Sequence, residues 1–105
     1  MFTYVVTIHI QKDAEARWVA WMKEEHIPEV LKTGLFYDCR MCRSEAEQQP
    51  GCTTYRMFYA LKSRAAFDTY EKDFAPALRQ HASEAGFSGL FTAERDLLET
   101  LHTFT

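Results

Sequence analysis

The sequence predicts an α+β domain in the ferredoxin-like order βαββαβ, with a four-stranded antiparallel sheet and its helices on one face. Segments that alternate in polarity at every second residue flank segments in which apolar residues recur at three- and four-residue steps. Right-handed crossovers would place both helices on the same face of the sheet. The chain has 105 residues, of which 47% are hydrophobic. That length gives room for one core, so residues 1–105 are expected to form a single domain.

The first part of the chain is predicted to be a strand followed by a helix. Phe2–Ile10 alternates large apolar residues with more polar ones, which is typical of a strand with one buried face. Ala14–Lys32 has helical periodicity, and Asp13 is the expected N-cap. Pro28 lacks a backbone N–H and crowds the carbonyl four residues before it. A kink or a new turn is therefore expected near His26.

The second part is predicted to be a hairpin, a broken helix and a last strand. Leu35–Arg43 is extended, and Cys52–Leu61 is a strand of similar length, joined to it by a polar loop that ends in Pro-Gly. Ser63 is expected to cap the next helix, which Pro76 should divide into two pieces. Leu90–Phe104 is expected to close the chain as a strand of undetermined register.

Composition and charge exclude several classes of partner. The net charge is -3, so the chain has no basic surface for nucleic acid. No apolar run approaches the roughly 18 residues of a membrane span, and the alternating start does not resemble a signal peptide. The count of three cysteines is odd, which argues against a disulfide framework. We therefore expect a cytoplasmic protein without a membrane or nucleic-acid partner.

One face of the predicted sheet has no helix to cover it. That face would carry Val5, either Phe36 or Tyr37, and either Phe58 or Tyr59. This is more exposed apolar surface than a monomer usually tolerates. Packing two such faces together gives a closed two-fold dimer, so we expect a homodimer.

Four stretches carry a resemblance to a known family. They are Trp18–Val30 (WVAWMKEEHIPEV), Thr54–Tyr59, Phe74–Arg79 and Phe91–Glu99. Together they resemble an uncharacterised bacterial family described only as a domain of unknown function, which is similar to a branch of the dimeric α/β-barrel superfamily. The resemblance implies two facing sheets with a cavity at the dimer centre. Relatives include cofactor-free mono-oxygenases, lactone isomerases, haem-degrading enzymes and members without known activity, so the fold alone decides no chemistry.

Glu25 and His26 are the candidate catalytic pair. On a continuous helix Glu25 lies within the arc of Trp18 and Trp21, and His26 lies on its flank. A carboxylate and an imidazole on such a semi-apolar wall would have shifted pKa values and could act as acid and base. In the alternative interpretation the chain turns at Pro28, Glu25 reaches solvent and His26 caps a carbonyl. Some members of the superfamily have a similar His-x-Pro in their first helix.

Four cationic side chains are candidates for binding an anionic ligand: His9, Arg40, Arg56 and Arg95. If the polar face of the first strand lines a dimer cavity, they could converge there, and guanidinium groups grip carboxylates well. In the alternative interpretation Arg40 and Arg56 pair with Asp38 or Glu94 on an exposed face.

No metal or cofactor is expected. Cys39 and Cys42 have CxxC spacing, but residues three apart on a strand point to opposite faces, so one ion cannot be held by both. Cys52 lies across the hairpin, and a fourth ligand with suitable spacing is missing. The sequence also has neither a glycine-rich phosphate loop nor a Gly-x-Ser-x-Gly elbow.

Two classes of function remain. The first is a protein of unknown function that acts as a dimeric module and binds a small molecule in the dimer cavity. The alternative is a cofactor-independent enzyme, of mono-oxygenase or isomerase type, acting on a small anionic or phenolic substrate. An enzyme would need titratable groups that converge on a closed pocket.

Overall fold

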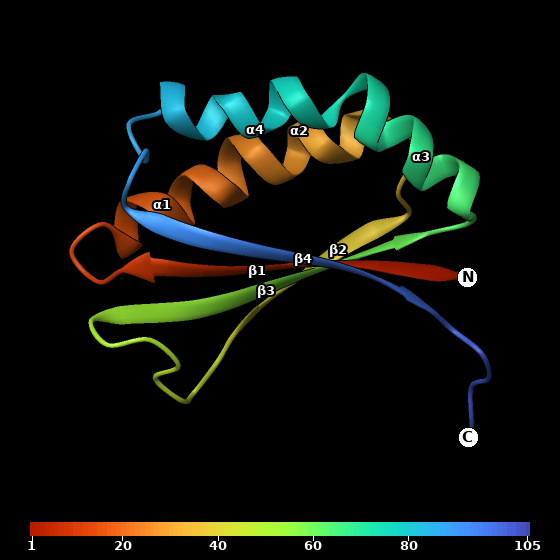
Figure 1. Cartoon of the computed structure of the whole chain (residues 1–105), viewed down its shortest axis with the longest axis horizontal. Helices are drawn as coiled ribbons and strands as arrows, with labels where there is room; N and C mark the ends of the chain where they lie inside the picture. The colour runs from red at the N-terminus through yellow and green to blue at the C-terminus, as the bar shows by residue number, and fades with distance from the viewer.

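The computed structural model describes residues 1–105 as one sheet with helices on one side (Figure 1). Along the chain the elements are β1 (Phe2–Gln11), α1 (Glu15–Trp21), η1 (Met22–His26), α2 (Ile27–Lys32), β2 (Asp38–Arg43), β3 (Cys52–Leu61), α3 (Arg64–Asp73), α4 (Ala75–Glu84) and β4 (Phe91–Glu99). The segments α1, η1 and α2 form the first helical region, and α3 and α4 form the second. The predicted ferredoxin-like order is confirmed.

The sheet has four strands in the order β2-β3-β1-β4, and every neighbouring pair is antiparallel. β1 is therefore central, between β3 and β4. The predicted hairpin of β2 and β3 is confirmed. Each position of β1 from Phe2 to Ile10 has a partner on both sides; Thr7, for example, pairs with Arg56 of β3 and with Glu94 of β4. These pairings fix which side chains share a face of the sheet.

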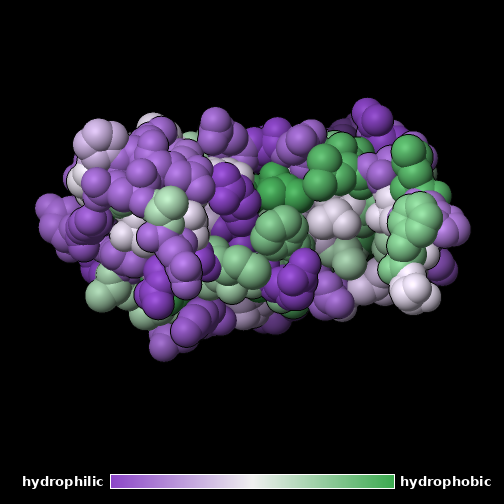
Figure 2. Space-filling model, turned by 90° about the horizontal axis from the view of Figure 1, so that it is seen from below, coloured by the Kyte–Doolittle hydropathy of each residue, from purple (hydrophilic) through white to green (hydrophobic).

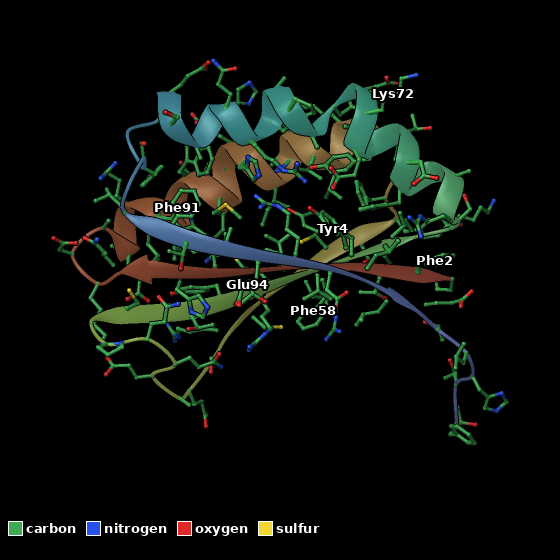
Figure 3. All side chains as sticks on the ribbon, viewed as in Figure 1. Phe2, Tyr4, Phe58, Lys72, Phe91 and Glu94 are labelled. Carbon is green, nitrogen blue, oxygen red and sulfur yellow. The ribbon has the colours of Figure 1, made fainter.

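Alternate side chains of the strands face the helices and form the core. Figure 3 shows Tyr4 and Phe91 on the helix side of the sheet, and Phe58 and Glu94 on the other side. The buried core residues are Tyr4, Ile8 and Ile10 of β1, Tyr55, Met57, Tyr59 and Leu61 of β3, and Ala14, Trp18, Met22, Val30, Phe36, Tyr70, Ala75, Leu78 and Phe87 of the helices and loops. Burying one such large side chain contributes roughly 1.5–3 kcal/mol.

The start of the first helix differs from the prediction. The N-cap is Ala14, which makes no side-chain capping bond, so the prediction of Asp13 as the cap is wrong. Glu15 instead accepts hydrogen bonds from the hydroxyl of Tyr55 at 2.5 Å and from that of Thr53 at 2.7 Å. These bonds, the one from Tyr55 foremost, lower the pKa of Glu15. They tie the helix start to β3, which replaces local capping.

A wide turn precedes Pro28, at the place where a kink or a new turn was expected. The backbone N–H of Ile27 donates to the carbonyl of Met22, five residues earlier, which makes η1 a π-helical turn. A proline ring clashes with the carbonyl four residues before it, and one extra residue in the turn relieves this crowding. After the turn, α2 resumes with Pro28 in its first turn, where the missing N–H costs nothing.

The second helical region follows the prediction closely. The Ser63 hydroxyl accepts from the backbone N–H of Ala66 at 3.1 Å, so the predicted cap is confirmed. The helix breaks at Phe74, just before Pro76, and α3 and α4 result. No helix is long and apolar enough to cross a membrane.

The last strand is shorter than predicted. β4 ends at Glu99, which pairs with Phe2, and Thr100 donates to the carbonyl of Met1 at 2.9 Å. Beyond that point β1 offers no further backbone to pair with, so the strand cannot extend to Phe104. The tail after Glu99 turns away from the helices, toward the uncovered side of the sheet (Figure 1).

We call the side of the sheet without helices the open face. It is formed by Asp38, Arg40 and Cys42 of β2, Thr54, Arg56, Phe58 and Ala60 of β3, Thr3, Val5, Thr7 and His9 of β1, and Thr92, Glu94, Asp96 and Leu98 of β4. Figure 2 looks onto this face and shows apolar side chains gathered from its centre toward the end where both termini lie. Of the predicted alternatives, Phe58 lies on this face, whereas Tyr59 and Phe36 are in the core.

Candidate functional site

A small cavity lies inside the chain, between the helices and the sheet. Its volume is about 70 Å³. Eleven of its 14 lining residues are hydrophobic; the lining consists of Tyr4, Val6, Ile8, Met57, Tyr59, Phe91 and Arg95 from the strands and Trp18, Trp21, Met22, His26, Tyr70, Arg79 and Ala82 from the helices. At about 10–15 Å³ for each water-sized group, the cavity holds several such groups. It therefore has room for part of a small ligand, held among aromatic rings.

His26 is the one histidine that lines this cavity. Its ring stacks on Trp21, with 4.9 Å between centroids and 24° between planes, and its Nδ1 is buried without a hydrogen-bond partner. Burial lowers its pKa to about 4, and the nearby His81 and Arg95 act in the same direction. His26 is therefore neutral at neutral pH, with one ring nitrogen as donor and the other as acceptor. A buried polar atom without a partner is costly, and a ligand group can satisfy it.

The wide turn η1 is what aims His26 at the cavity. The inward side chains of the first helical region are Trp18, Met22, His26 and Val30, each four residues after the last. A regular α-helix would bring Glu25, not His26, back toward the sheet, because three- and four-residue steps alternate in it. The extra residue of the π turn therefore selects the imidazole for the cavity wall.

Glu25 lies outside the cavity and is exposed to solvent. Glu25 and His26 share the wall of a second, wider groove, but that groove is mostly polar and also contains Glu24, Glu29, Lys32, His81 and Glu84. The alternative interpretation was right about the exposure of Glu25. The π turn explains the difference, since the helical spacing used for the prediction does not hold there. His26 does not cap a carbonyl either, because its buried Nδ1 has no partner.

Two arginines contribute to the cavity, and their surroundings differ. Arg79 of α4 donates to the Tyr4 hydroxyl at 3.3 Å and to both carboxylate oxygens of Glu71, at 2.7 and 3.0 Å. Arg95 of β4 is exposed, and its charge helps to lower the pKa of His26. Arg79 is thus held in place by a carboxylate, whereas Arg95 presents positive charge at the edge of the cavity.

The hydroxyls of Tyr59 and Tyr70, two residues that line the cavity, are neutral donors. Burial is the largest cause that raises the pKa of Tyr59 and of Tyr70 above the usual range. Cys39, close to Tyr59, has its pKa raised to about 11 by burial. The three groups carry no charge at neutral pH, and the two hydroxyls can orient a polar ligand atom by hydrogen bonding.

The four predicted anion-binding residues do not converge. His9, Arg40 and Arg56 lie on the open face, whereas Arg95 lies on the helix side with Phe91. The prediction that Arg95 joins the other three is wrong, because its position on β4 has the opposite parity. His9 is 5% exposed; its Nδ1 lies 2.7 Å from the Thr54 hydroxyl, and its Nε2 lies 3.2 Å from a Glu94 carboxylate oxygen.

The two arginines of the open face are not bound to carboxylates of their own chain. Arg56 donates to the Gln48 side chain at 3.1 Å, and the Arg40 guanidinium lies 5.1 Å from the centre of the Phe58 ring. The predicted alternative, in which they pair with Asp38 or Glu94, is therefore wrong, and Glu94 contacts His9 instead. A shallow groove runs between Arg40, Arg56 and the exposed Cys42.

The cysteines are separated as their spacing predicts. All three are free; Cys39 belongs to the helix side of the sheet, and Cys42 belongs to the open face. No group of three or more His, Cys, Asp or Glu side chains is placed to hold a metal ion.

Comparison with known proteins supports the fold and leaves the chemistry open. The family described as Domain of unknown function (DUF4286) matches residues 1–101. No curated protein matches the chain. Among solved structures, HapK from Hahella chejuensis is similar, with a TM-score of 0.71 and 17% identity over 100% of this chain and 97% of that one.

Two further structures extend the comparison. A dimeric ferredoxin-like protein from an uncultured marine organism has a TM-score of 0.69 and 11% identity, over 100% of this chain and 99% of that one. SnoaB from Streptomyces nogalater, a cofactor-independent oxygenase, has a TM-score of 0.64 and 15% identity, over 97% and 95%. At these identities the likeness establishes the fold alone.

Proposed function

This chain belongs to the family described as Domain of unknown function (DUF4286), and from that premise we propose that it is a binding module for a small molecule. The ligand is largely apolar and carries one anionic or phenolic group. Part of the ligand enters the cavity between the helices and the sheet, so the proposed site is inside each chain and not at the dimer centre.

The unpaired imidazole of His26 is the observation that carries this proposal. Most of the cavity wall is apolar, which suits an aromatic or aliphatic body. The buried Nδ1 of His26 offers one hydrogen bond, and Arg95 adds positive charge beside it. No Asp or Glu side chain lines the cavity, so an anionic group meets no repulsion from its walls. A phenol or a carboxylate satisfies this arrangement.

We propose binding rather than turnover because the catalytic set is incomplete. The alternative, a cofactor-independent mono-oxygenase or isomerase, would use neutral His26 as the general base. Its second predicted group, Glu25, is exposed to solvent and does not line the cavity. His26 would then act alone.

Binding can be tested with phenol, benzoate and benzene as probes. The chain has two tryptophans, and both line the cavity, so their indole signals in a ¹⁵N–¹H spectrum report on its occupant. We expect phenol and benzoate to shift both signals at lower concentration than benzene does. Arg95→Met should weaken benzoate binding about tenfold. A hydrogen bond to a charged group contributes roughly 1.5–3 kcal/mol, and tenfold corresponds to the lower end of that range.

The matched control is Arg64→Met, which removes an exposed arginine on α3 that pairs with Asp68 away from the cavity. It should leave the affinities for phenol and for benzoate unchanged. The proposal fails if no probe moves the indole signals at millimolar concentration, or if the Arg64 and Arg95 variants behave alike.

We also propose that the chain forms a homodimer through its open face. Val5 and Phe58 are neighbours in the middle of that face, and Leu98 of β4 is 47% exposed. Two of the similar structures are dimeric ferredoxin-like proteins. Joining two open faces removes this apolar surface from water.

Sedimentation velocity at tens of micromolar should therefore show a dimer. Phe58→Glu should convert it to a monomer, because an unpaired charge would lie in the centre of the interface. Ala77→Glu adds the same charge at an exposed site on α4 and should leave the dimer intact. A wild-type monomer at that concentration contradicts the proposal.

A further inference from the structure

The charges of the open face are divided between its two halves. Glu94 and Asp96 lie on β4, at one edge of the sheet, whereas Arg40 and Arg56 lie on β2 and β3, at the other. One acid, Asp38, lies on the basic half, at the first position of β2. A surface with separated charges of opposite sign can recognise its own copy, because each half complements the other.

The strand pairings arrange these residues in rows across the sheet. Cys42, Arg56, Thr7 and Glu94 form one row, and Arg40, Phe58, Val5 and Asp96 form the next. In both rows the acidic residue stands on β4, and in both a residue of β2 stands at the opposite end. A rotation that exchanges the two ends of a row therefore places the acidic residue of β4 in one copy against the β2 residue of the same row in the other copy.

The exposed apolar side chains are also divided between the two edges. Tyr37, just before β2, is 57% exposed, and Leu98, near the end of β4, is 47% exposed. Both lie at the end of the sheet near the N-terminus, because Leu98 pairs with Thr3, and Asp38, next to Tyr37, pairs with Ala60, the other partner of Thr3. Leu101 and Phe104, in the tail that follows β4, are 88% and 86% exposed. Within one chain β1 and β3 separate these groups, so they cannot cover one another.

Two copies can pack their open faces together, with aligned strands, in two ways. If the two-fold axis runs along the strands, β4 of one copy lies over β2 of the other. If the axis runs across the strands, β4 lies over β4 and β2 lies over β2. The first way sets acidic residues against basic ones, and the second sets like charges together.

We infer that the two-fold axis of the proposed homodimer runs along the strands. Asp96 then lies opposite Arg40 of the partner subunit, and Glu94 lies opposite Cys42 of the partner subunit and next to its Arg56. The same rotation brings Leu98 opposite the partner's Asp38, because Asp38, Ala60, Thr3 and Leu98 form one row, and the partner's Tyr37 is the next residue along the chain. At the centre, Val5 of each copy faces Phe58 of the other copy, because the two residues are neighbours in one row. The distribution of charge thus selects this arrangement, and this inference rests on the proposed dimer.

Neutralising the charges tests the arrangement. The double variants Glu94→Gln/Asp96→Asn and Arg40→Gln/Arg56→Gln should each weaken dimerisation about tenfold at low salt, and both should reduce its dependence on salt. Glutamine at position 94 keeps an acceptor for His9. If β4 lay over β4, removing its two acids would relieve repulsion and strengthen the dimer, which would overturn the inference. Glu84→Gln, on the exposed side of α4, is the control and should change nothing.

Cross-linking gives a second and independent measurement. Cys42 is exposed on the open face and belongs to the same row as Glu94. In a Cys52→Ser background, Glu94→Cys treated with a short bifunctional thiol reagent should yield a covalent dimer. Adding Cys42→Ser should abolish that product. A covalent dimer formed through Cys42 alone, without Glu94→Cys, would place β2 over β2 and overturn the inference.

The outcomes separate this inference from the proposal beneath it. A wild-type protein that stays monomeric contradicts both the homodimer and its arrangement. A dimer that strengthens on removal of Glu94 and Asp96, or that cross-links through Cys42 alone, contradicts only the arrangement.

Discussion

Replacing Trp18 with alanine should lower the free energy of unfolding by about 3–5 kcal/mol, the usual cost of removing a large aromatic side chain from a core. Trp18 is 2% exposed, and its ring lies 5.0 Å from that of Tyr55. Tyr55 in turn donates to Glu15 at the start of α1. The substitution therefore leaves a hole beside the bond that ties the first helical region to β3. Urea unfolding followed by circular dichroism, at one fixed protein concentration, measures the loss.

Trp21→Ala is the matched comparison, since it removes the same side chain from the same helix. Trp21 is only half-buried, and it contacts Phe87 and His26 at the cavity. We expect a clearly smaller loss, because part of its surface already meets water. Equal losses in the free energy of unfolding would show that the buried contact between Trp18 and Tyr55 does not stabilise the fold more than the half-buried contacts of Trp21 do.

The stability of the protein should fall between pH 7 and pH 5 because of His26. The pKa of its imidazole is lowered to about 4 in the folded chain, from an ordinary value of 6.5. The unfolded chain therefore binds a proton in this range more readily than the folded chain does, and stability rises with pH. Above pH 6.5 His26 is mostly neutral in both the folded and the unfolded chain, so it takes nothing from the free energy of unfolding. As the pH falls from 6.5 toward 4, protonation of His26 in the unfolded chain lowers that free energy. The expected loss at pH 5 is about 2 kcal/mol.

His26→Phe isolates this contribution. Phenylalanine preserves a ring that can stack on Trp21, and it has no proton to gain. Urea unfolding of both proteins at several pH values should show a steeper decline for the wild type between pH 7 and pH 5. Other groups, such as Glu15 with its lowered pKa, act mainly below this range and are shared by both proteins. Parallel pH profiles would mean that His26 takes up protons freely in the folded state.

The order of elements was predictable because each segment has a clear period. The alternation of Phe2–Ile10, the cap at Ser63 and the break before Pro76 are local properties of the sequence, and tertiary packing did not override them. The cap at Asp13 was not realised, because Glu15 found partners on β3 that are distant in sequence. Contacts of that kind have no local signature.

The site was harder to predict than the fold. A helical wheel assumes one spacing throughout, so it placed Glu25 inward and could not represent the extra residue of η1. On β4 the two alternating sets are both mixed: Arg95 shares its side with Phe91, and Leu98 shares its side with Glu94. Polarity alone therefore could not assign Arg95 to a face. Arg79 was missed because nothing near it in the sequence shows that Tyr4 is its neighbour.

The strand order has a consequence for how this protein avoids aggregation. β2 and β4 are the two edges of the sheet, and each leaves one row of backbone donors and acceptors unpaired. Such edges can pair with strands of other molecules, and repeated pairing of this kind produces open-ended polymers. Here both edges carry charge at short intervals, with Asp38, Arg40 and Arg43 on β2 and three consecutive charged residues at 94–96 on β4. These charges discourage edge-to-edge growth, and the proposed dimer would associate through a face, where a two-fold pair is complete and cannot grow into a fibre.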